Sequence, residues 1–371
     1  MLPAPNTVGP RLADVLASCL DSLAGAPNRL GLPAASSAIM VLVDGLGVES
    51  LRAAAGHART LVGALGKRDA IESGFPTTTA AALASLTTGL PPGRHGLVGY
   101  LVRDPARDRI VNQLSGWDAG MEPHTWQPFP TVFQAAVERG YRASVVGLAK
   151  FADSGFTSAV LRGAEYVPRR TIADRLDAAV ELAREPGALV YVYVPELDKA
   201  GHKYGVDSPR WIRALEEVDG AIRALALPSG VGLVLTADHG MLDIPQHGRV
   251  IVDPALLDGV RHVAGEPRCL QLHIESGADA SALAARWRDA EGARAWVATR
   301  QEAIDAGWFG AVRDEVLPRI GDVLVAARKG VAYYDERGAS EQGFTMIGQH
   351  GSWSPAEVRV PLLRFGAYAR G

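Results

Sequence analysis

The residues best suited to chemistry in this sequence are aspartates and histidines that follow strongly apolar runs. Asp238 and His239 come directly after the run at 231–235, and Asp44 follows a second run at 38–43. Runs that are apolar at consecutive positions are typical of strands buried on both faces, as in parallel sheets covered by helices. Function in such sheets lies just beyond the carboxyl ends of the strands. We therefore expect these side chains to meet at one site, although either motif alone would also fit a solvated strand end.

Two further segments carry the same residue types. Asp198 and His202 follow a third apolar run and stand four positions apart, the spacing that places two side chains on one helical face. His350 lies in a loop flanked by glycines, and Thr77, Thr78 and Thr79 precede a run of helix-forming residues. A hydroxyl at a helix start faces unpaired N–H groups and the positive end of the helix dipole, which suits an anion such as phosphate. The alternative is that these threonines only cap the helix.

Carboxylates, imidazoles and a hydroxyl together form a set of metal ligands. Zn²⁺ binds such groups, and Mn²⁺ or Fe could replace it in nitrogen and oxygen sites. Three aspartates and three histidines exceed the needs of one tetrahedral ion, so they predict two divalent ions. Two ions roughly 3.5–4 Å apart can hold both the attacking and the leaving oxygen of a displacement at phosphorus. A metal-bound threonine would then be ionised and could act as a nucleophile.

Composition narrows the class of protein. The 371 residues carry a net charge of −3, so no overall basic field points to nucleic acid or to an anionic membrane as a partner. Cys19 and Cys269 lack CxxC spacing, which fits a reducing compartment. No apolar run reaches the roughly 18–20 residues of a membrane span, and the N-terminal residues do not resemble a secretory signal. We expect a cytoplasmic enzyme acting on a small phosphorylated substrate; the oligomeric state cannot be derived from these patterns.

Alternating strand and helix patterns must position these residues. They predict an α/β sandwich with a mainly parallel central sheet flanked by helices. After residue 253 the pattern changes to a strand at 269–274, a helix at 281–289 and a hairpin formed by 320–327 and 331–334. Residues 254–336 are therefore expected to form a small α+β cap, inserted in a catalytic domain made of 1–253 and 337–371. The chain is expected to end in one strand at 360–365.

Taken together, these motifs resemble the alkaline phosphatase superfamily and its type I phosphodiesterase/nucleotide pyrophosphatase family. Asp44 after a buried strand is followed in the same order by PTTTAAALASLTTGLPPGRHG, DKAGHKYG, ADHGM and GQHG. The resemblance implies an alkaline-phosphatase-like sandwich and two metal ions. It assigns Asp198, His202 and His350 to one ion, and Asp44, Asp238 and His239 to the other. Counting ten residues back from Gly89 implies that Thr79 is the nucleophile, contacts the metals and forms a phospho-threonine intermediate.

The substrate pocket departs from that family pattern. The nucleophile of nucleotide-cleaving members is followed by Phe-Pro-Asn, whereas Ala80 to Ala82 follow it here. Tyr100 stands where those members have an Asn that holds a phosphoryl oxygen, and Tyr166 where they have a second base-stacking Tyr. Both are therefore candidate substrate-binding residues. We predict a hydrolase of phosphodiester or pyrophosphate bonds, with a nucleotide among the candidate substrates. The alternatives are a phosphate monoesterase or phosphonate (C–P) hydrolase with the same site, and a non-catalytic metal-binding module.

Overall fold

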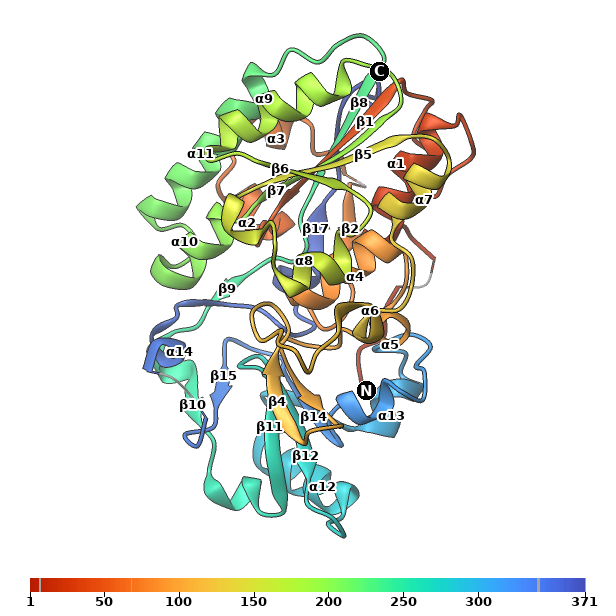
Figure 1. The fold of residues 1–371 in the computed structure, drawn as a ribbon. Coiled ribbons are helices and arrows are strands. Elements are labelled where there is room, and N and C mark those ends of the chain that lie inside the picture. Colours follow the sequence, from red (N-terminus) through yellow and green to blue (C-terminus); the bar gives the residue numbers. More distant parts are fainter. Residues whose placement is uncertain (7, 68, 339–340, 371) are drawn as a thin grey trace.

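Two six-stranded sheets, one above the other in Figure 1, organise the computed structural model of the chain. The model describes residues 1–371 apart from positions 7, 68, 339–340 and 371. Within the described residues, no helix is long and apolar enough to cross a membrane. The upper sheet carries the strands that were predicted from apolar runs, and the lower sheet contains most of the expected cap.

The upper sheet is parallel except for one edge strand. In spatial order its strands are β18 (Leu363–Gly366), β8 (Val231–Thr236), β1 (Ser37–Val43), β7 (Ala188–Val194), β5 (Arg142–Gly147) and β6 (Glu165–Pro168). Only β18 runs antiparallel to its neighbour. Every residue of β1 and β8 is buried, because helices cover both faces of the sheet. The predicted α/β class with a mainly parallel sheet is thus confirmed.

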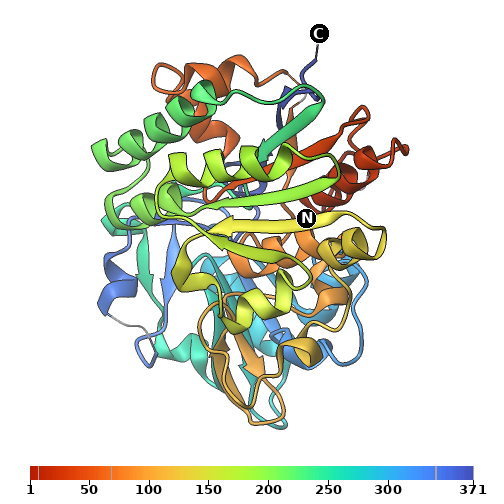
Figure 2. The same cartoon turned by 45° about the horizontal axis from the view of Figure 1, so that its top comes forward.

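Helices pack on each face of this sheet, as Figure 2 shows. α9 (Ile172–Ala183) lies across β7, β1 and β5, and α11 (Pro209–Ala224) packs beside it. α1 (Val15–Leu23) and α7 (Val132–Glu138) cover the other face. Side chains start several of these helices, because Thr171 and Ser208 accept hydrogen bonds from backbone N–H groups of the first turns of α9 and α11. The sequence pattern therefore positions the sheet through ordinary amphipathic helices.

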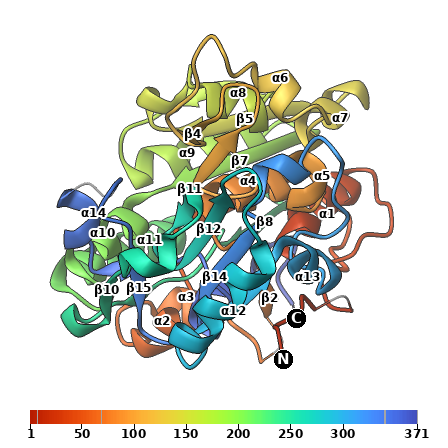
Figure 3. The same cartoon turned by 90° about the horizontal axis from the view of Figure 1, so that it is seen from below.

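The lower sheet is antiparallel and is seen most directly in Figure 3. Its strands, in order, are β13 (Ala295–Thr299), β14 (Val323–Ala327), β12 (Cys269–Ile274), β11 (Val260–Glu266), β3 (Leu101–Asp104) and β4 (Arg109–Asn112). α12 (Ala280–Glu291) and α13 (Arg300–Asp305) pack against β13 and β14. β3 and β4 precede the expected insertion by about 150 residues of chain, so the lower sheet is not built from 254–336 alone. The predicted domain boundaries stay a prediction.

Two expectations about strands were wrong. The predicted hairpin between 320–327 and 331–334 does not form, because both edges of β14 are already paired, with β13 and with β12. β15 (Ala332–Tyr334) instead pairs in parallel with β10 (Arg249–Ile251). The single strand predicted at 360–365 is divided: β17 (Arg359–Pro361) pairs with β2 (Ala70–Glu72), and β18 pairs with β8.

Short elements complete the chain and carry several of the candidate residues. The α-helices among them are α2 (Val48–Ala53), α3 (Arg59–Gly63), α4 (Thr79–Thr88), α5 (Pro92–His95), α6 (Pro123–Trp126), α8 (Gly155–Val160), α10 (Glu196–Tyr204), α14 (Glu341–Thr345) and α15 (Pro355–Val358). β9 (Leu242–Asp243) and β16 (Gly348–Gln349) pair with each other. Gly89 ends α4 in a left-handed conformation, with φ +69°, which favours glycine.

Candidate metal centre and active site

Three neighbouring strands of the upper sheet deliver the predicted ligands to one edge. β1 pairs in parallel with both β7 and β8, so the carboxyl ends of all three strands lie side by side. Asp44 follows β1, Asp238 and His239 follow β8, and α10 begins just after β7. Gly45 allows this approach, because a Cβ atom at that position would lie 3.1 Å from Cα of Asp198. The structure therefore brings together residues that are almost 200 positions apart.

His239 is the centre of one part of the cluster. Its Nε2 atom lies 3.5 Å from Oδ1 of Asp44 and 3.4 Å from Oδ2 of Asp238. The same nitrogen lies 3.2 Å from Oγ1 of Thr79. All four side chains are buried or nearly so. Two carboxylates, an imidazole and a hydroxyl thus point at one another in a space that little water reaches.

The second part of the cluster combines α10 with the loop after β16. Asp198 and His202 lie on one face of α10, as their spacing predicted, with Oδ1 and Nε2 3.2 Å apart. His350 Nε2 lies 3.2 Å from Nε2 of His202 and 3.8 Å from Oδ1 of Asp198. The rings of His350 and His239 stack, with centroids 3.6 Å apart, so the two parts of the cluster are contiguous.

Backbone carbonyl groups orient all three histidines in the same way. Nδ1 of His202 lies 2.8 Å from the carbonyl oxygen of Gly348, and Nδ1 of His350 lies 2.7 Å from that of Thr77. Nδ1 of His239 lies 3.1 Å from the carbonyl oxygen of Gly240. A carbonyl only accepts, so each Nδ1 carries a proton, and in the neutral form of each ring Nε2 keeps a free lone pair. This is the arrangement by which proteins orient histidine ligands toward a metal ion.

The buried carboxylates supply an independent test of whether a cation fits. Oδ1 of Asp44 and Oδ2 of Asp238 are buried and have no hydrogen-bond partner among the described residues. Burial, and next the charges of the neighbouring aspartates, raise the pKa of Asp44 well above its usual range. Burial likewise raises the pKa of Asp238, although His239 partly offsets it. Crowded buried carboxylates are costly unless a cation lies among them, so the donor set fits divalent metal.

Ligand atoms fall into two groups that could each hold an ion. One group contains Asp44, Asp238 and His239, and the other contains Asp198, His239 and His350, with the donor atoms of each group within 4.8 Å of one another. His239 belongs to both groups, whereas the family resemblance assigned it to one. His202 lies beside the second group at the distances given above. The division of ligands between two ions stays a prediction.

Two residues of the second group, Asp198 and His350, have shifted pKa values that favour the protonation states able to bind a metal. Burial would raise the pKa of Asp198, but His202, and after it His350, lower that pKa below its usual range. Burial lowers the pKa of His350 well below its usual range, and the neighbouring histidines lower it further. Asp198 is therefore a carboxylate and His350 a neutral imidazole near pH 7, and these are the forms that bind metals.

Of the three threonines, the structure brings Thr79 to the cluster. Thr79 is the first residue of α4, so its hydroxyl lies at the amino end of a ten-residue helix. The Thr77 hydroxyl instead donates to the carbonyl of Ser352 and accepts from the amide of Gly351. Thr78 faces the carboxyl of Glu266. The three adjacent hydroxyls therefore have different surroundings, and only the last of them meets His239.

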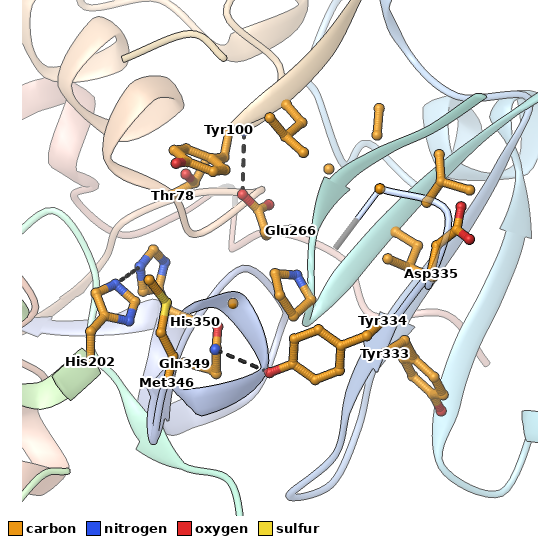
Figure 4. Close-up of a pocket in the computed structure, with 18 of the residues that line it drawn as sticks. Thr78, Tyr100, His202, Glu266, Tyr333, Tyr334, Asp335, Met346, Gln349 and His350 are labelled. Carbon is orange, nitrogen blue, oxygen red and sulfur yellow. Dashed lines mark hydrogen bonds between the residues drawn. The ribbon is translucent and has the colours of Figure 1, made fainter. Parts of the chain in front are cut away.

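The cluster opens into a pocket of about 510 Å³ between the two sheets. Figure 4 shows His202 and His350 at one side of it, Thr78 and Tyr100 at another, and Tyr334 and Asp335 across from the histidines. The described residues that line it are Thr78, Thr79, Tyr100, Leu101, Leu114, Asp198, His202, Val263, Ala264, Gly265, Glu266, Pro267, Leu270, Tyr333, Tyr334, Asp335, Gly338, Gly343, Met346, Gln349 and His350. This volume suits a small organic molecule.

The two predicted substrate-binding tyrosines lie in different places. Tyr100 lines the pocket and is 37% exposed. Tyr166 lies within β6, at the edge of the upper sheet, where its hydroxyl donates to the carbonyl of Leu148 at 2.9 Å. It is absent from the pocket lining described above. The structure thus brings Tyr100 to the pocket and leaves Tyr166 in the packing of the sheet edge.

Glu266 is the most prominent pocket residue that the sequence motifs did not indicate. It ends β11, is only 6% exposed, and its Oε2 atom accepts from the amide of Tyr100 at 3.3 Å. Burial raises the pKa of Glu266 to about 8, and the donors at Thr78 and Tyr100 offset only part of this effect. The only sequence signal was an acid in the turn Gly265-Glu266-Pro267, and turns with an acidic residue are common.

Comparison with known proteins settles the family. The model of the type I phosphodiesterase/nucleotide pyrophosphatase family matches residues 38–353. The chain belongs to this family. The resemblance expected from the sequence motifs is therefore confirmed, and the matched region contains all of the predicted metal ligands and Thr79.

Relatives within the family are distant. An uncharacterized pyrophosphatase/phosphodiesterase of Schizosaccharomyces pombe is 25% identical over 45% of this chain. Ectonucleotide pyrophosphatase/phosphodiesterase 1 of Saccharomyces cerevisiae is 26% identical over 50% of it. The matched regions cover 36% and 30% of those two proteins, about a third of their length.

Solved structures share the fold across nearly the whole chain. Phosphonoacetate hydrolase from Sinorhizobium meliloti aligns with a TM-score of 0.69 at 22% identity, covering 90% of this chain and 91% of that protein. Murine ectonucleotide pyrophosphatase/phosphodiesterase 5 aligns with a TM-score of 0.67 at 17% identity, covering 88% and 87%. The predicted family fold, with its central sheet and flanking helices, is confirmed by these alignments.

Proposed function

We propose that this family member is a metal-dependent hydrolase of phosphodiester or pyrophosphate bonds, with Thr79 as its nucleophile. The observation that carries the proposal is the position of the Thr79 hydroxyl, 3.2 Å from Nε2 of His239 and at the start of α4. The hydroxyl also lines the pocket. A nucleophile needs both activation and access to substrate, and Thr79 combines them.

The metal ligands we propose are Asp44, Asp238 and His239 for one ion, and Asp198, His202 and His350 for the other, with Thr79 as a further ligand. Unpartnered buried carboxylate oxygens and Nε2 lone pairs support this assignment. Zn²⁺ suits the donor set best, and Mn²⁺ or Fe could substitute. When bound, the ions would neutralise charge on the phosphoryl oxygens and favour the ionised form of the Thr79 hydroxyl.

The chemistry divides into two displacements at phosphorus. In the first, Oγ1 of Thr79 forms a bond to phosphorus while the bond to the leaving oxygen breaks, and the departing alcohol or phosphate takes up a proton. In the second, water attacks phosphorus and the bond to Oγ1 breaks, which restores the threonine hydroxyl. The amino end of α4 would stabilise the negative charge during both steps. Tyr100 lies where it could donate a hydrogen bond to a phosphoryl oxygen.

Names of similar proteins support the nucleophile and the substrate class. An inactive threonine-to-alanine variant of murine ectonucleotide pyrophosphatase/phosphodiesterase 5 has been solved in complex with AMP. The S. cerevisiae relative is likewise named a nucleotide pyrophosphatase/phosphodiesterase. A phosphate ester, with a nucleotide among the candidates, is therefore the substrate class we propose.

The decisive experiment combines metal analysis with turnover. The purified protein should contain about two equivalents of divalent metal and should hydrolyse bis-p-nitrophenyl phosphate faster than p-nitrophenyl phosphate or phosphonoacetate. Thr79→Ala should lower kcat by on the order of 10³-fold or more while the metal content stays unchanged. Mass spectrometry of quenched wild-type enzyme should show a phosphoryl adduct on Thr79.

Neighbouring threonines supply matched controls. Thr79→Ser should retain measurable turnover because it keeps the hydroxyl, whereas Thr77→Val should mainly lower stability, since the Thr77 hydroxyl binds the backbone of Ser352 and Gly351. Full activity of Thr79→Ala would refute the nucleophile. Undiminished activity after complete metal removal would refute the metal-dependent mechanism, and faster turnover of phosphonoacetate than of the diester would favour a C–P hydrolase.

A further inference from the structure

Glu266 is a buried acid at the pocket wall whose hydrogen-bonding capacity is only partly used. Its Oε2 atom accepts from the Tyr100 amide, whereas Oε1 is buried and has no hydrogen-bond partner among the described residues. Figure 4 shows the carboxyl between Tyr100 and the histidine side of the pocket. A buried acceptor without a partner is costly, so such an atom in a binding pocket indicates a missing hydrogen-bond donor.

Glu266 lies on the pocket wall, beside the chain segments that carry Thr79 and His350. The strand β11 that carries it belongs to the lower sheet, and its neighbour Thr78 is adjacent in the chain to the proposed nucleophile. Gly351 leaves room for it, because a Cβ atom there would lie 2.3 Å from Cγ of Glu266. A group bound to phosphorus at Thr79 and entering the pocket would therefore pass Glu266.

The charged residues in the rest of the pocket also indicate what kind of substrate group fits there. The described lining residues include Asp198, Glu266 and Asp335 but neither lysine nor arginine. Asp335 is paired with Arg337 at 2.9 Å, so that acid is already neutralised. The remaining wall is largely apolar or aromatic, with Leu101 and Met346 as examples. Apart from His202 and His350, which are proposed metal ligands, the described lining offers no basic partner to a second negative charge on the substrate.

We infer that Glu266 selects the substrate: the organic group that enters the pocket carries a hydrogen-bond donor, a hydroxyl or an ammonium, and no negative charge. The donor binds the carboxyl of Glu266, which lines the pocket and has hydrogen-bonding capacity left. This inference rests on the proposed phosphodiesterase function and narrows it to singly charged diesters, disfavouring polyphosphates and carboxylated phosphonates.

A set of mixed diesters tests this selectivity. Each carries one p-nitrophenyl group and one variable group: 3-hydroxypropyl, 3-aminopropyl, propyl or 2-carboxyethyl. For the metal-loaded enzyme, kcat/KM for the hydroxypropyl and aminopropyl esters should exceed that of the propyl ester by about 10-fold or more, because an unpaired buried acceptor discriminates strongly. The carboxyethyl ester should be the poorest. A larger advantage of the amine would show that Glu266 ionises on binding, and a larger advantage of the alcohol that it stays protonated.

Variants identify the residue responsible. Glu266→Gln should abolish the aminopropyl advantage and relieve the carboxyethyl penalty, while Glu266→Ala should bring the hydroxypropyl and propyl esters to similar kcat/KM values. Asp335→Asn is the matched control, because it removes a pocket acid that already has a cationic partner; it should leave all ratios unchanged. A wild-type enzyme that prefers the carboxyethyl ester, or ratios that are the same in Glu266→Gln, would overturn the inference.

Failure of the inference and failure of the proposed function give different results. If no ester is hydrolysed above the rate of Thr79→Ala, the proposed phosphodiesterase function fails. The inference can then still be decided by calorimetry of ester binding to metal-loaded Thr79→Ala, in which the same order of affinities is expected. Turnover of all esters at similar rates would retain the function and refute the role of Glu266.

Discussion

The two sides of the pocket differ in how their residues are held. On the side with the proposed metal ligands, side chains follow β1 and β8 of the parallel sheet or lie on α10 after β7, and His350 follows β16; each histidine contacts a backbone carbonyl. On the opposite side, residues come from β3 and the end of β11, which pair with each other in the lower sheet, and from β15 around Tyr334, which pairs with β10. The side with the proposed metal ligands consists of polar side chains. The opposite side is mostly apolar and contains one acid, Glu266, with an unpartnered oxygen.

This difference suggests that one side of the pocket carries out the chemistry and the other recognises the rest of the substrate. Groups that interact with phosphorus must be placed accurately, which a packed parallel sheet provides. Groups that recognise the rest of the substrate can vary without loss of the chemistry, since they lie on a different sheet. A fully buried bidentate pair between Arg268 and Glu357, at 2.8 and 2.7 Å, is one of the contacts that join the turn after β11 to α15.

Substitution of a proposed metal ligand should have the largest effect. Asp238→Asn keeps the shape of the side chain but removes a charge from the group formed with Asp44 and His239. We expect kcat/KM for every diester to fall by on the order of 10³-fold, together with loss of about one metal equivalent. Asp335→Asn, on the opposite side, should change kcat/KM for bis-p-nitrophenyl phosphate by less than about threefold. Equal effects of the two variants would contradict this difference between the two sides of the pocket.

Loss of the buried ion pair should mainly reduce stability. Glu357 accepts from Arg268 and also from the amide of Ser352, close to the His350 loop. Glu357→Gln should lower the free energy of unfolding by about 4 kcal/mol in urea titrations, because Arg268 keeps an uncompensated buried charge. The exposed pair of Arg184 with Glu181 provides a control, and Glu181→Gln should cost less than about 1 kcal/mol. Similar costs for both variants would show that the bridge contributes little.

The buried acid predicts a pH dependence of stability. The folded-state pKa of Glu266 is raised to about 8 from 4.5, so the folded state binds its proton more tightly than the unfolded state. Its stabilising contribution is complete below the unfolded pKa and is lost as pH rises toward 8. Relative to Glu266→Gln, the free energy of unfolding of wild type should fall by roughly 3 kcal/mol between about pH 5 and 8. Parallel pH profiles of the two proteins would contradict the raised pKa.

The smallest expected effect concerns the two tyrosines. Tyr100→Phe should raise KM for bis-p-nitrophenyl phosphate by about two- to tenfold, the cost of one hydrogen bond, if its hydroxyl binds a phosphoryl oxygen. Tyr166→Phe should leave KM and kcat unchanged, because that hydroxyl binds the carbonyl of Leu148 outside the pocket. A larger kinetic effect of Tyr166→Phe than of Tyr100→Phe would reverse this interpretation and support the original sequence-based prediction for Tyr166.

How well each region could be predicted depended on the range of its interactions. β1, β7 and β8 are apolar at almost every position because both faces of their sheet are covered, and such runs are visible in the sequence. β15 could not be assigned correctly, because its pairing with β10 depends on which strand edges remain free after the lower sheet forms. β3 and β4 were missed for a similar reason: four-residue strands carry little periodicity, and β11, which pairs with β3, lies far along the chain.

The sequence by itself was enough to predict the fold class, the family and the set of Asp, His and Thr residues that are candidate metal ligands and nucleophile. This was possible because those residues follow strands or begin helices, and local sequence patterns show where strands end and helices start. Tertiary structure decided which residues actually meet: it brought His350 onto His239, separated Thr79 from Thr77 and Thr78, and directed Tyr166 away from the pocket. It also placed Glu266, at the end of β11, beside Thr78, the residue before α4, and no local pattern encodes this contact.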